Sequence, residues 1–430
     1  MGIPTNGMVI TEDTTLQPGV YFLSDGITIA ADGVTLDGNG ALLVGHNRTG
    51  RGVTVQNHKG VTIKNLHLQE YYHGIYSRAC QGLAITGCQV TATAEVPSNT
   101  IFLDIWLPLE KAYGGGILLA EVENSLIINN DLQHQMVGLL SYHCRNLTVK
   151  SNVANYCSGW GFHIYDTCDS LYEDNCADYC CRYEPRGERK GHMGADASGF
   201  LIIYRSCKNI FRRNLARLGG DGFFLAGLSP AFEPVPCNGN LFEENDGSYS
   251  PNIAFEATFS AENIYRNNFA NHCNYGFWLG FSRDGVLENN QMIGNVRAGI
   301  ATENGINFRV HNNVFKDNDH GILLWSHHVP EFIIAVPEND TSYNWRIEEN
   351  SFVHNNKAIR IAENQDHGIR PNKVTPGQIP TTRYRPHDHF IRLNKFEENR
   401  LGIEAISTTG TVVEENLFDL PNNNVIDVQE

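Results

Sequence analysis

Short runs of alternating apolar and polar residues, each opened by a glycine, recur along most of the chain. From Gly276 the sequence reads GFWLGFSRDGVLENNQMIGNVRA. From Gly299, 23 residues later (299 − 276), a second copy reads GIATENGINFRVHNNVF. Each copy contains two alternating strands, a short turn between them and a closing Asn-Asn pair. A repeat of this kind determines the fold, because each unit specifies one coil that stacks on the next.

The glycine start recurs at a basic spacing of 22 or 23 residues (74 − 52 and 161 − 138). Its copies begin at Gly52, Gly74, Gly116, Gly138, Gly161, Gly199, Gly222, Gly276, Gly299, Gly321 and Gly402, with Asn252-Ile253 and Lys357-Ala358-Ile359 as degenerate copies. A unit this short holds strands and no helix. Strands that repeat once per unit stack in parallel on their equivalents, about 4.8 Å apart. The crossover rule makes such a coil right-handed.

An asparagine closes the second strand of most units. It is found at Asn65, Asn130, Asn152, Asn175, Asn214, Asn245, Asn267, Asn290, Asn313, Asn350 and Asn416. Asparagine suits a tight turn because it tolerates the left-handed backbone region and hydrogen-bonds the local backbone. Stacked once per coil, these residues predict an internal asparagine ladder.

The glycine-isoleucine starts and Asn-Asn turns resemble the right-handed parallel β-helix repeat of the pectate-lyase-like superfamily. The segments 16–21 (LQPGVY) and 33–40 (GVTLDGNG) resemble the first coils of such proteins. The resemblance implies an all-β fold, a single right-handed parallel β-helix of about 13 coils. For function it implies less, because superfamily members include polysaccharide lyases, glycoside hydrolases, uronan epimerases and non-catalytic proteins.

The repeat predicts one elongated domain. Residues 1–50 are expected to form an N-terminal cap and the first coils, and residues 51–430 the β-helix. Five insertions lengthen its turns, at residues 92–113, 182–197, 228–239, 326–344 and 364–389. All five border the first strand of a unit, and insertions gathered on one side usually mark the binding face. Strand one is therefore predicted to be the floor of a groove.

The net charge and the N-terminal sequence limit the partners and the cellular location that can be expected. The net charge of −16 argues against a nucleic acid or an anionic membrane as partner. No apolar run approaches the length of a transmembrane helix. The start, MGIPTNGMVITEDTT, lacks the basic and apolar segments of a signal peptide. The expected location is the cytoplasm, or outside the cell if a signal has been removed.

The eleven cysteines are odd in number and regularly placed, which predicts mostly free, buried thiols. Cys80, Cys144, Cys168 and Cys207 each precede the first apolar residue of a second strand by three positions. No zinc motif is present: the nearest approaches are Cys176, Cys180 and Cys181, and His387 with His389, and both lack further ligands. No metal and no cofactor are predicted.

Alternation gives the side chains that face outward along strand one. In the N-terminal half they include an apolar patch made of Leu118, Leu140, Leu201, Ile203 and Phe224. A soluble monomer normally covers such a patch. The apolar stretch 101–109 of the first insertion is expected to lie over it. The alternative is a subunit interface, which would make the protein a homo-oligomer.

Farther along, the floor becomes polar. Glu256, Gly280 and Glu303 are predicted to share one outward row on three successive coils. Two glutamates two coils apart approach the separation at which one acid protonates a leaving oxygen and the other activates water. Trp278 and Trp325 would offer apolar faces to a sugar. The simpler alternative for an outward glutamate is a solvated surface side chain.

Other outward residues complete the candidate site. Asp221 resembles the Asp-Gly of polygalacturonase-type hydrolases, although the other motifs of that family are missing, and serves as a reserve carboxylate. His163 is a candidate acid or base. Tyr142, Tyr165 and Arg360 are candidate substrate-binding residues. A turn-forming aspartate and a surface histidine are the corresponding structural alternatives.

The sequence therefore favours a glycoside hydrolase that acts on an oligo- or polysaccharide in the strand-one groove. The first alternative is a uronan lyase or C5-epimerase, which needs a base for the α-carbon proton and a cation to neutralise the substrate carboxylate. The second is a non-catalytic carbohydrate-binding or structural β-helix. A groove lined by Arg or Lys opposite a Tyr or His would favour the lyase.

Overall fold

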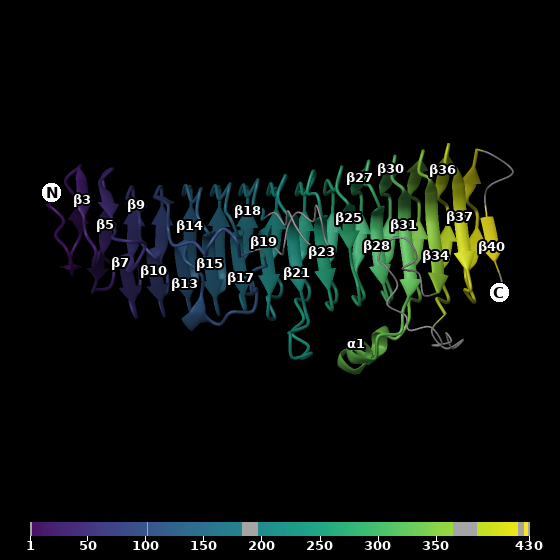
Figure 1. Cartoon of the computed structure of the whole chain (residues 1–430), viewed down its shortest axis with the longest axis horizontal. Helices are drawn as coiled ribbons and strands as arrows, with labels where there is room; N and C mark the ends of the chain where they lie inside the picture. The colour runs from purple at the N-terminus through teal and green to yellow at the C-terminus, as the bar shows by residue number, and fades with distance from the viewer. Residues whose placement is uncertain (1, 101, 183–196, 364–384, 420–424, 429–430) are drawn as a thin grey trace. The chain divides into compact units, whose positions relative to one another are not determined.

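The computed structural model describes residues 2–100, 102–182, 197–363, 385–419 and 425–428. The chain divides into two compact units, Met1–Phe224 and Leu225–Glu430. Each unit is built from coils of short strands (Figure 1).

In the first unit three series of strands repeat, one member per coil. The strand-one series is β1 (Met8–Ile10), β4 (Ile27–Ile29), β7 (Arg51–Gln56), β10 (His73–Arg78), β13 (Gly115–Ala120), β15 (Val137–Tyr142), β17 (Trp160–Tyr165), β19 (Ser198–Ile203) and β21 (Asp221–Ala226), which contains the boundary. The second series is β2 (Thr14–Thr15), β5 (Thr35–Asp37), β8 (Thr62–Lys64), β11 (Ala84–Thr86), β14 (Glu123–Ile128), β16 (Arg145–Lys150), β18 (Leu171–Glu173) and β20 (Ile210–Arg212). The third is β3 (Val20–Phe22), β6 (Leu42–Val44), β9 (His67–Gln69) and β12 (Gln89–Thr91), and the insertion contains the 3₁₀-helix η1 (Leu109–Lys111).

The second unit repeats the arrangement. Its strand-one series is β23 (Ile253–Thr258), β25 (Tyr275–Trp278), β28 (Ala298–Glu303), β31 (His320–Ser326), β34 (Lys357–Glu363), β37 (Leu401–Ile406) and β40 (Val425–Val428). The second series is β22 (Leu241–Glu243), β24 (Ile264–Arg266), β26 (Val286–Glu288), β29 (Arg309–His311), β32 (Arg346–Glu348), β35 (Phe390–Arg392) and β38 (Val412–Glu414). The third is β27 (Gln291–Ile293), β30 (Val314–Lys316), β33 (Ser351–Val353), β36 (Lys395–Glu397) and β39 (Leu417–Phe418); helices α1 (Pro330–Ala335) and η2 (Pro337–Asn339) lie in an insertion.

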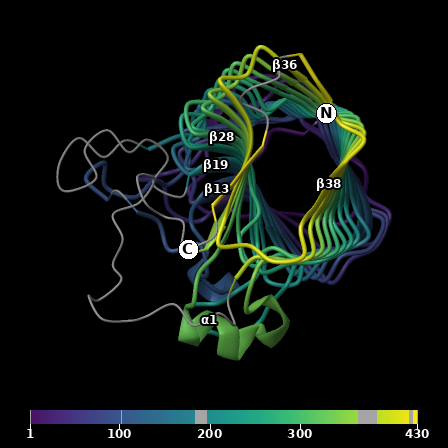
Figure 2. The same cartoon turned by 90° about the vertical axis from the view of Figure 1, so that its right-hand side faces the viewer.

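Each strand pairs in parallel with its equivalents in the neighbouring coils. Ile75 of β10, for example, faces Val53 of β7 and Ile117 of β13. Seen end-on, equivalent strands such as β13 and β19 lie behind one another (Figure 2). The predicted fold class, an all-β right-handed parallel β-helix, is confirmed. Among the described residues, 16 strands occupy the strand-one position rather than about 13, because the strands that begin at Met8, Ile27 and Val425 each add one coil.

The opening glycine is required by the distance between coils. A Cβ on Gly138 would lie 2.6 Å from the carbonyl oxygen of Gly161 in the next coil. The pairing also skips the glycine: His73 pairs with Gly115 and Ile75 with Ile117, so that Gly74 lies between two paired positions. As a result the residue just before the glycine points outward, which adds a third outward row to strand one.

The predicted asparagine ladder is present in both units. In the first unit Asn130 Nδ2 donates to Asn152 Oδ1 (2.9 Å), and the pattern continues from Asn152 to Asn175 (3.0 Å). In the second unit it runs through Asn245, Asn268, Asn290, Asn313, Asn350, Asn394 and Asn416. Two predicted members are wrong. Asn65 and Asn267 adopt positive φ (52° and 57°), and Asn267 takes the turn position just before the ladder residue Asn268.

The described insertions lie against the strand-one side. Leu103 and Ile105 of the first insertion are buried, and Leu118 and Leu140 are 1% and 0% exposed. Cover by the first insertion is thus confirmed at the Leu118 and Leu140 end of this apolar patch, whereas its cover over the rest of the patch and the homo-oligomer stay predictions. In the second unit Phe332 of α1 packs on Phe259 and Phe281.

Insertions 182–197 and 364–389 fall largely outside the described residues. The division into a cap and a β-helix stays a prediction. Among the helices of the described segments, none has the length and apolarity that a bilayer crossing requires. All eleven cysteines are free, but Cys168, Cys176, Cys181 and Cys207 are only half-buried.

Candidate functional site

The two glutamates predicted as a catalytic pair lie in different rows of the second unit. Glu256 of β23 faces Trp278 of β25, which in turn faces Ala301 of β28. Glu303 is two residues beyond Ala301 on the same strand. The predicted single row of Glu256, Gly280 and Glu303 is therefore wrong. The carboxylate separation inferred from that row no longer supports an inverting pair.

The error comes from a copy of the repeat that lacks a glycine. The sequence pattern placed Ile253 at the first inward position, whereas Phe255 occupies that position and pairs with Phe277. A slip of one residue would move every side chain to the other face, but a slip of two keeps the alternation intact. The slip of two residues places Glu256 in the outward row of Trp278 instead of the outward row of Gly280.

The predicted carboxylates have separate environments. Glu303 Oε1 lies 2.6 Å from Nδ1 of His327, and the Glu303 side chain is 13% exposed. Glu256 is half-buried on β23. Asp221 begins β21 and is 1% exposed. Their catalytic roles stay predictions.

The tryptophans predicted as sugar platforms are covered. Trp278 is 4% exposed and Trp325 is 1% exposed. Their ring centroids are 5.5 Å apart in an edge-to-face arrangement, and Tyr275 lies 5.1 Å from Trp278. Together with Leu323 they belong to an apolar cluster on the outer side of strand one. In this structure neither ring has an open face for a sugar, because each is packed into that cluster.

Arg360, a predicted substrate-binding residue, is engaged by a carboxylate. Its Nη1 contacts Glu404 Oε2, and Lys357 Nζ lies 2.7 Å from the same oxygen. Burial opposes the ionised form of Glu404, but the hydrogen bond from Lys357 and the charge of Arg360 hold the pKa of this carboxyl below its usual value. The cluster is a half-buried ion triad.

His163, Tyr142 and Tyr165 come together in the first unit beneath the first insertion. The Tyr142 ring lies 5.2 Å from His163 and 5.0 Å from Tyr165. The Tyr142 hydroxyl donates to the Leu107 carbonyl (3.2 Å). His163 is 2% exposed, and burial lowers its pKa to about 4. The imidazole is therefore neutral at pH 7, and the insertion covers it.

An open pocket of about 420 Å³ lies elsewhere on the first unit, over β7 and β10. The lining comes from the outward rows of strand one and from η1. Its polar members are Arg51, Tyr72, His73, Tyr76, Arg78 and Glu110. The volume is within the range of small-ligand sites. The predicted groove lies over strand one around Glu256 and Glu303, whereas this pocket lies over strand one near the N-terminal end and is lined by different residues.

Two arginines and one glutamate, Glu110, line this pocket. The Arg51 guanidinium carbon lies 3.4 Å from the centroid of the Tyr76 ring. Within the described segments no carboxylate forms an ion pair with Arg51. Arg78 Nη2, by contrast, pairs with Glu121 Oε1 at 2.9 Å. Arg51 is thus held by a stacking contact that leaves its N–H groups available.

His73 and Tyr72 lie beside this cation. His73 Nε2 lies 3.0 Å from the Tyr113 carbonyl, so Nε2 carries the proton and Nδ1 keeps its lone pair. Burial, and secondarily the charge of Arg51, lowers the His73 pKa to about 4 against the effect of that hydrogen bond. Burial, together with Tyr113, raises the pKa of Tyr72, whose hydroxyl donates to the Ala112 carbonyl at 2.8 Å.

Comparison with known families decides the class of the chain. Residues 19–216 and 95–249 match the model described as right handed beta helix region. The two matches together run from residue 19 to residue 249, more than half of the 430 residues. The chain belongs to the right-handed β-helix family.

A second model covers part of this β-helix protein. Residues 234–333 match the family described as periplasmic copper-binding protein (NosD). Over the parts of the chain that the structure describes, no group of three or more His, Cys, Asp or Glu side chains is placed to hold a metal ion.

Several solved β-helix structures are similar to this one. The catalytic unit of the GH87 α-1,3-glucanase from Streptomyces thermodiastaticus strain HF3-3 is 9% identical, with 90% of this chain and 64% of that chain covered and a TM-score of 0.52. The A-module of mannuronan C-5 epimerase AlgE6 from Azotobacter vinelandii is 12% identical, covering 99% and 91%, with a TM-score of 0.43. The periplasmic alginate epimerase AlgG is 14% identical, covering 92% and 79%, with a TM-score of 0.41. At such low identity these likenesses concern the fold alone. No curated protein matches the sequence.

The pocket residues were missed for a geometrical reason. The alternation in the sequence predicts outward side chains only after the glycine of each repeat. Arg51 and His73 precede their glycines, and they face outward only because the pairing skips the glycine. The usable signal was a basic or histidine residue immediately before the repeat's glycine.

Proposed function

We propose that this β-helix protein acts on an acidic polysaccharide and removes the C5 proton of a uronate residue bound in the Arg51 pocket. The observation that supports the proposal most is an arginine without a carboxylate partner among the described residues, in a pocket shared with a histidine and two tyrosines. A basic side chain opposite Tyr or His is the lining that favours a uronan lyase or epimerase. By contrast, Glu256 and Glu303, the carboxylates predicted for a hydrolase, do not share one outward row.

Arg51 is the group that would neutralise the substrate carboxylate. A guanidinium offers a planar pair of N–H donors that fits a carboxylate. Removing a proton next to a carboxylate builds negative charge on that carboxylate, so a fixed cation stabilises the transition state more than the ground state. The whole chain carries −16 and repels a polyanion, so binding needs a cation at the site, and Arg51 supplies it.

His73 and Tyr72 supply the proton transfers. His73 Nδ1 is the candidate base, since the imidazole is neutral at pH 7 and its other nitrogen donates to Tyr113. Tyr72, whose pKa is raised, keeps its hydroxyl proton and is the candidate acid. If the C5 carbanion expels the O4 substituent and Tyr72 protonates it, the reaction is an elimination. If Tyr72 instead gives its proton to C5 on the opposite face, the reaction is an epimerisation.

A substrate screen tests the proposal. The full chain is incubated in D₂O with oligomannuronate, oligoguluronate, oligogalacturonate and a neutral glucan. Elimination is read by absorbance of unsaturated ends, epimerisation by deuterium at C5 in NMR spectra, and hydrolysis by new reducing ends that form without unsaturated ends. We expect turnover on at least one uronate, without hydrolysis. Reducing ends on the neutral glucan without C5 chemistry would overturn the proposal in favour of the hydrolase.

Substitutions in the pocket test the role proposed for each residue. Arg51→Ala is expected to lower kcat/KM by about 10²–10³, the loss typical of one charged transition-state contact. Arg51→Lys is expected to recover only part of this, because an ammonium lacks the planar pair of donors. His73→Gln and Tyr72→Phe are expected to lower kcat by about 10²–10⁴. Arg309→Ala, an exposed arginine on β29 of the second unit, is the matched control and should leave kcat/KM unchanged.

We propose in addition a location outside the cytoplasm, supported by the partial match to a family described as periplasmic. Fractionation of the source cells with an antibody against the protein tests this. Recovery of the protein only with cytoplasmic markers would contradict it.

A further inference from the structure

Cys168 and Cys207, which the sequence pattern grouped with the interior thiols, do not occupy the interior position of Cys144 in their coils. Cys144 is interior, and its backbone N–H donates to Thr167 Oγ1 in the next coil. Cys168, one residue after Thr167, instead pairs with Arg145 in a parallel bridge. Cys168 and Cys207 are therefore half-buried, whereas Cys144 is fully buried.

The displacement by one residue has a clear cause. Leu147 is an inward residue, 1% exposed, and its N–H donates to Ser170 Oγ of the next coil. Ser170 and Asn209 are polar, yet they occupy the inward position in their coils. Leu171, the first apolar residue after Cys168, therefore pairs with Thr148 and lies one position later in the coil than Leu147.

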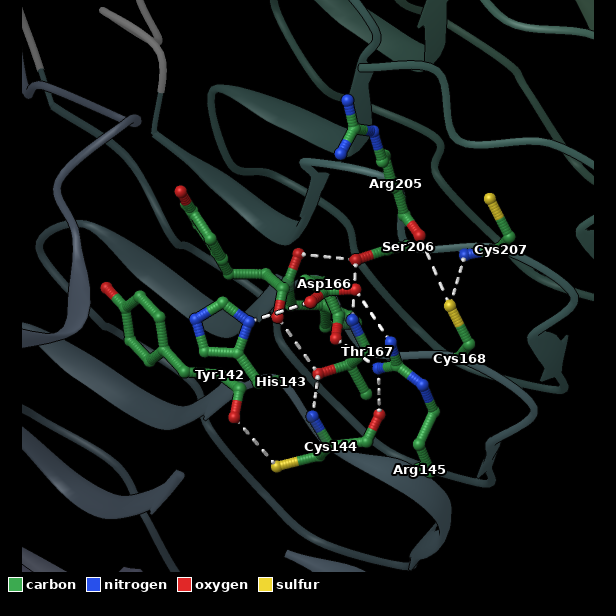
Figure 3. A network of polar contacts seen from close by, with 12 residues as sticks. Tyr142, His143, Cys144, Arg145, Asp166, Thr167, Cys168, Arg205, Ser206 and Cys207 are labelled. Carbon is green, nitrogen blue, oxygen red and sulfur yellow. Dashed lines mark hydrogen bonds and ion pairs between the residues drawn. The ribbon is translucent and has the colours of Figure 1, made fainter. Parts of the chain in front are cut away.

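Cys168 and Cys207 are direct neighbours in adjacent coils. Leu171 pairs with Ile210, three residues after the respective cysteines. The Cys207 backbone N–H donates to Cys168 Sγ at 3.2 Å, and Cys168 Sγ lies 3.2 Å from the Arg205 carbonyl (Figure 3). Adjacent strands are about 4.8 Å apart, within the range of about 4.4–6.8 Å between Cα atoms that a disulfide requires.

A fixed cation stands beside the pair. Arg145 Nη2 lies 2.8 Å from Asp166 Oδ1, and Arg145 Nη1 donates to the Cys144 carbonyl at 2.7 Å (Figure 3). Asp166 also lies 2.7 Å from His143 Nδ1. These contacts hold the guanidinium in the turn next to Cys168.

The same geometry favours the thiolate of Cys168. The hydrogen bond from the Cys207 side chain, then the Cys207 amide and the charge of Arg145, lower the pKa of Cys168 to about 6, against partial burial and Asp166. Burial acts in the opposite direction on other thiols. It raises the pKa of Cys88 and of Cys144 to about 12, and the pKa of Cys176 to about 11.

We propose that Cys168 and Cys207 form a reactive thiol pair that exchanges with small-molecule disulfides and closes to a disulfide between two successive coils. The Cys168 thiolate attacks one sulfur of R–S–S–R, which forms Cys168–S–S–R and releases RS⁻. The Cys207 thiol then loses its proton to water and attacks the Cys168 sulfur, which releases the second RS⁻. Two electrons pass from the cysteine pair to the small disulfide. The site is independent of the uronate pocket.

Closure would cross-link residues 168 and 207 and enclose the insertion between them. A cross-link over a long loop restricts the unfolded chain. The oxidised protein should therefore resist urea better than the reduced protein, and the difference should disappear on addition of a reductant.

Limited alkylation of the native full chain is the first test. The protein is treated briefly with iodoacetamide over a series of pH values, quenched, unfolded and mapped by mass spectrometry. We expect Cys168 to be labelled first, with a half-maximal rate near pH 6. Cys181, half-buried but with a pKa raised by burial, is the internal control and should react only at much higher pH. Labelling of Cys181 before Cys168 would overturn the proposal.

Treatment with oxidised glutathione is the second test. Wild-type protein is expected to yield a Cys168–Cys207 peptide pair and no lasting glutathione adduct. Cys207→Ser should stop at a mixed disulfide on Cys168, and Cys168→Ser should form neither product. Arg145→Gln should move the alkylation midpoint to higher pH, a readout that a purely structural role would not shift. Wild-type protein that remains fully reduced, or a wild-type disulfide joining other cysteines, would refute the pair.

Discussion

The asparagine ladder is expected to stabilise the coils strongly, and Asn290 allows this to be measured. Asn290 Oδ1 accepts from the backbone N–H of Asn268 (2.9 Å) and from Asn268 Nδ2 (3.0 Å). Asn290 Nδ2 donates to the Tyr265 carbonyl (2.9 Å) and to Asn313 Oδ1 (3.0 Å). Asn290→Ala removes all of these bonds and leaves buried polar groups without partners.

The magnitude follows from these contacts. A typical intramolecular hydrogen bond contributes about 1 kcal/mol net, and an unsatisfied buried partner costs about 1–3 kcal/mol. The two lost acceptor contacts and two lost donor contacts therefore predict a loss of about 4 kcal/mol from the free energy of unfolding. Asn290 is 0% exposed, so water does not replace them without local opening.

Urea unfolding, followed by circular dichroism, measures the loss as a shift of the midpoint at constant slope. Asn289→Gly is the matched control: Asn289 is the adjacent residue, exposed, with φ of 56°, and glycine accepts this conformation without strain. We expect the control to stay within about 0.5 kcal/mol of wild type. If Asn290→Ala shifts the midpoint no more than Asn289→Gly does, the ladder does not stabilise the coils.

Three further outcomes are expected. The His163 pKa is lowered to about 4, so the unfolded chain gains a proton first and stability falls as pH drops from about 6.5 to about 4, by up to about 1.4 kcal/mol per pH unit for this group. His163→Gln should reduce that slope in urea titrations at several pH values, and an unchanged slope would contradict the assignment. Gly138→Ala places a Cβ 2.6 Å from the Gly161 carbonyl oxygen and should lower the thermal midpoint clearly; an unchanged midpoint would show that the coils separate easily. Glu303→Gln should leave uronate turnover unchanged, and a loss of two orders of magnitude would return the site to the second unit.

The repeat made the fold predictable because one short pattern specifies a whole coil. The glycine, the alternation and the closing asparagine each have a packing reason that acts locally. A Cβ at Gly138 would collide with the next coil, and Asn290 satisfies groups in its neighbours. The same regularity made it hard to predict which position in the coil a given residue occupies. Asn267 and Asn268 are chemically identical, and only the backbone shows which of them enters the ladder.

The site was harder to predict because it depends on register. Where a glycine was missing, Ile253 and Phe255 were both acceptable inward residues, and the wrong choice gave Glu256 a false row. The outward position of Arg51 depends on the pairing that skips Gly52 and Gly74, and single-sequence alternation does not contain that information. The burial of Trp278 likewise depends on packing against neighbours such as Trp325 and Leu323, which an outward row does not show.

The central claim is that a uronate binds at Arg51 and loses its C5 proton. The most direct measurement is NMR of the full chain with uronate oligosaccharides in D₂O, comparing wild type, Arg51→Ala and Arg309→Ala. The account predicts C5 deuterium or unsaturated ends with wild type and with Arg309→Ala, and a loss of about 10²–10³ with Arg51→Ala. Equal turnover by Arg51→Ala and Arg309→Ala, or no C5 chemistry on any uronate, would contradict it.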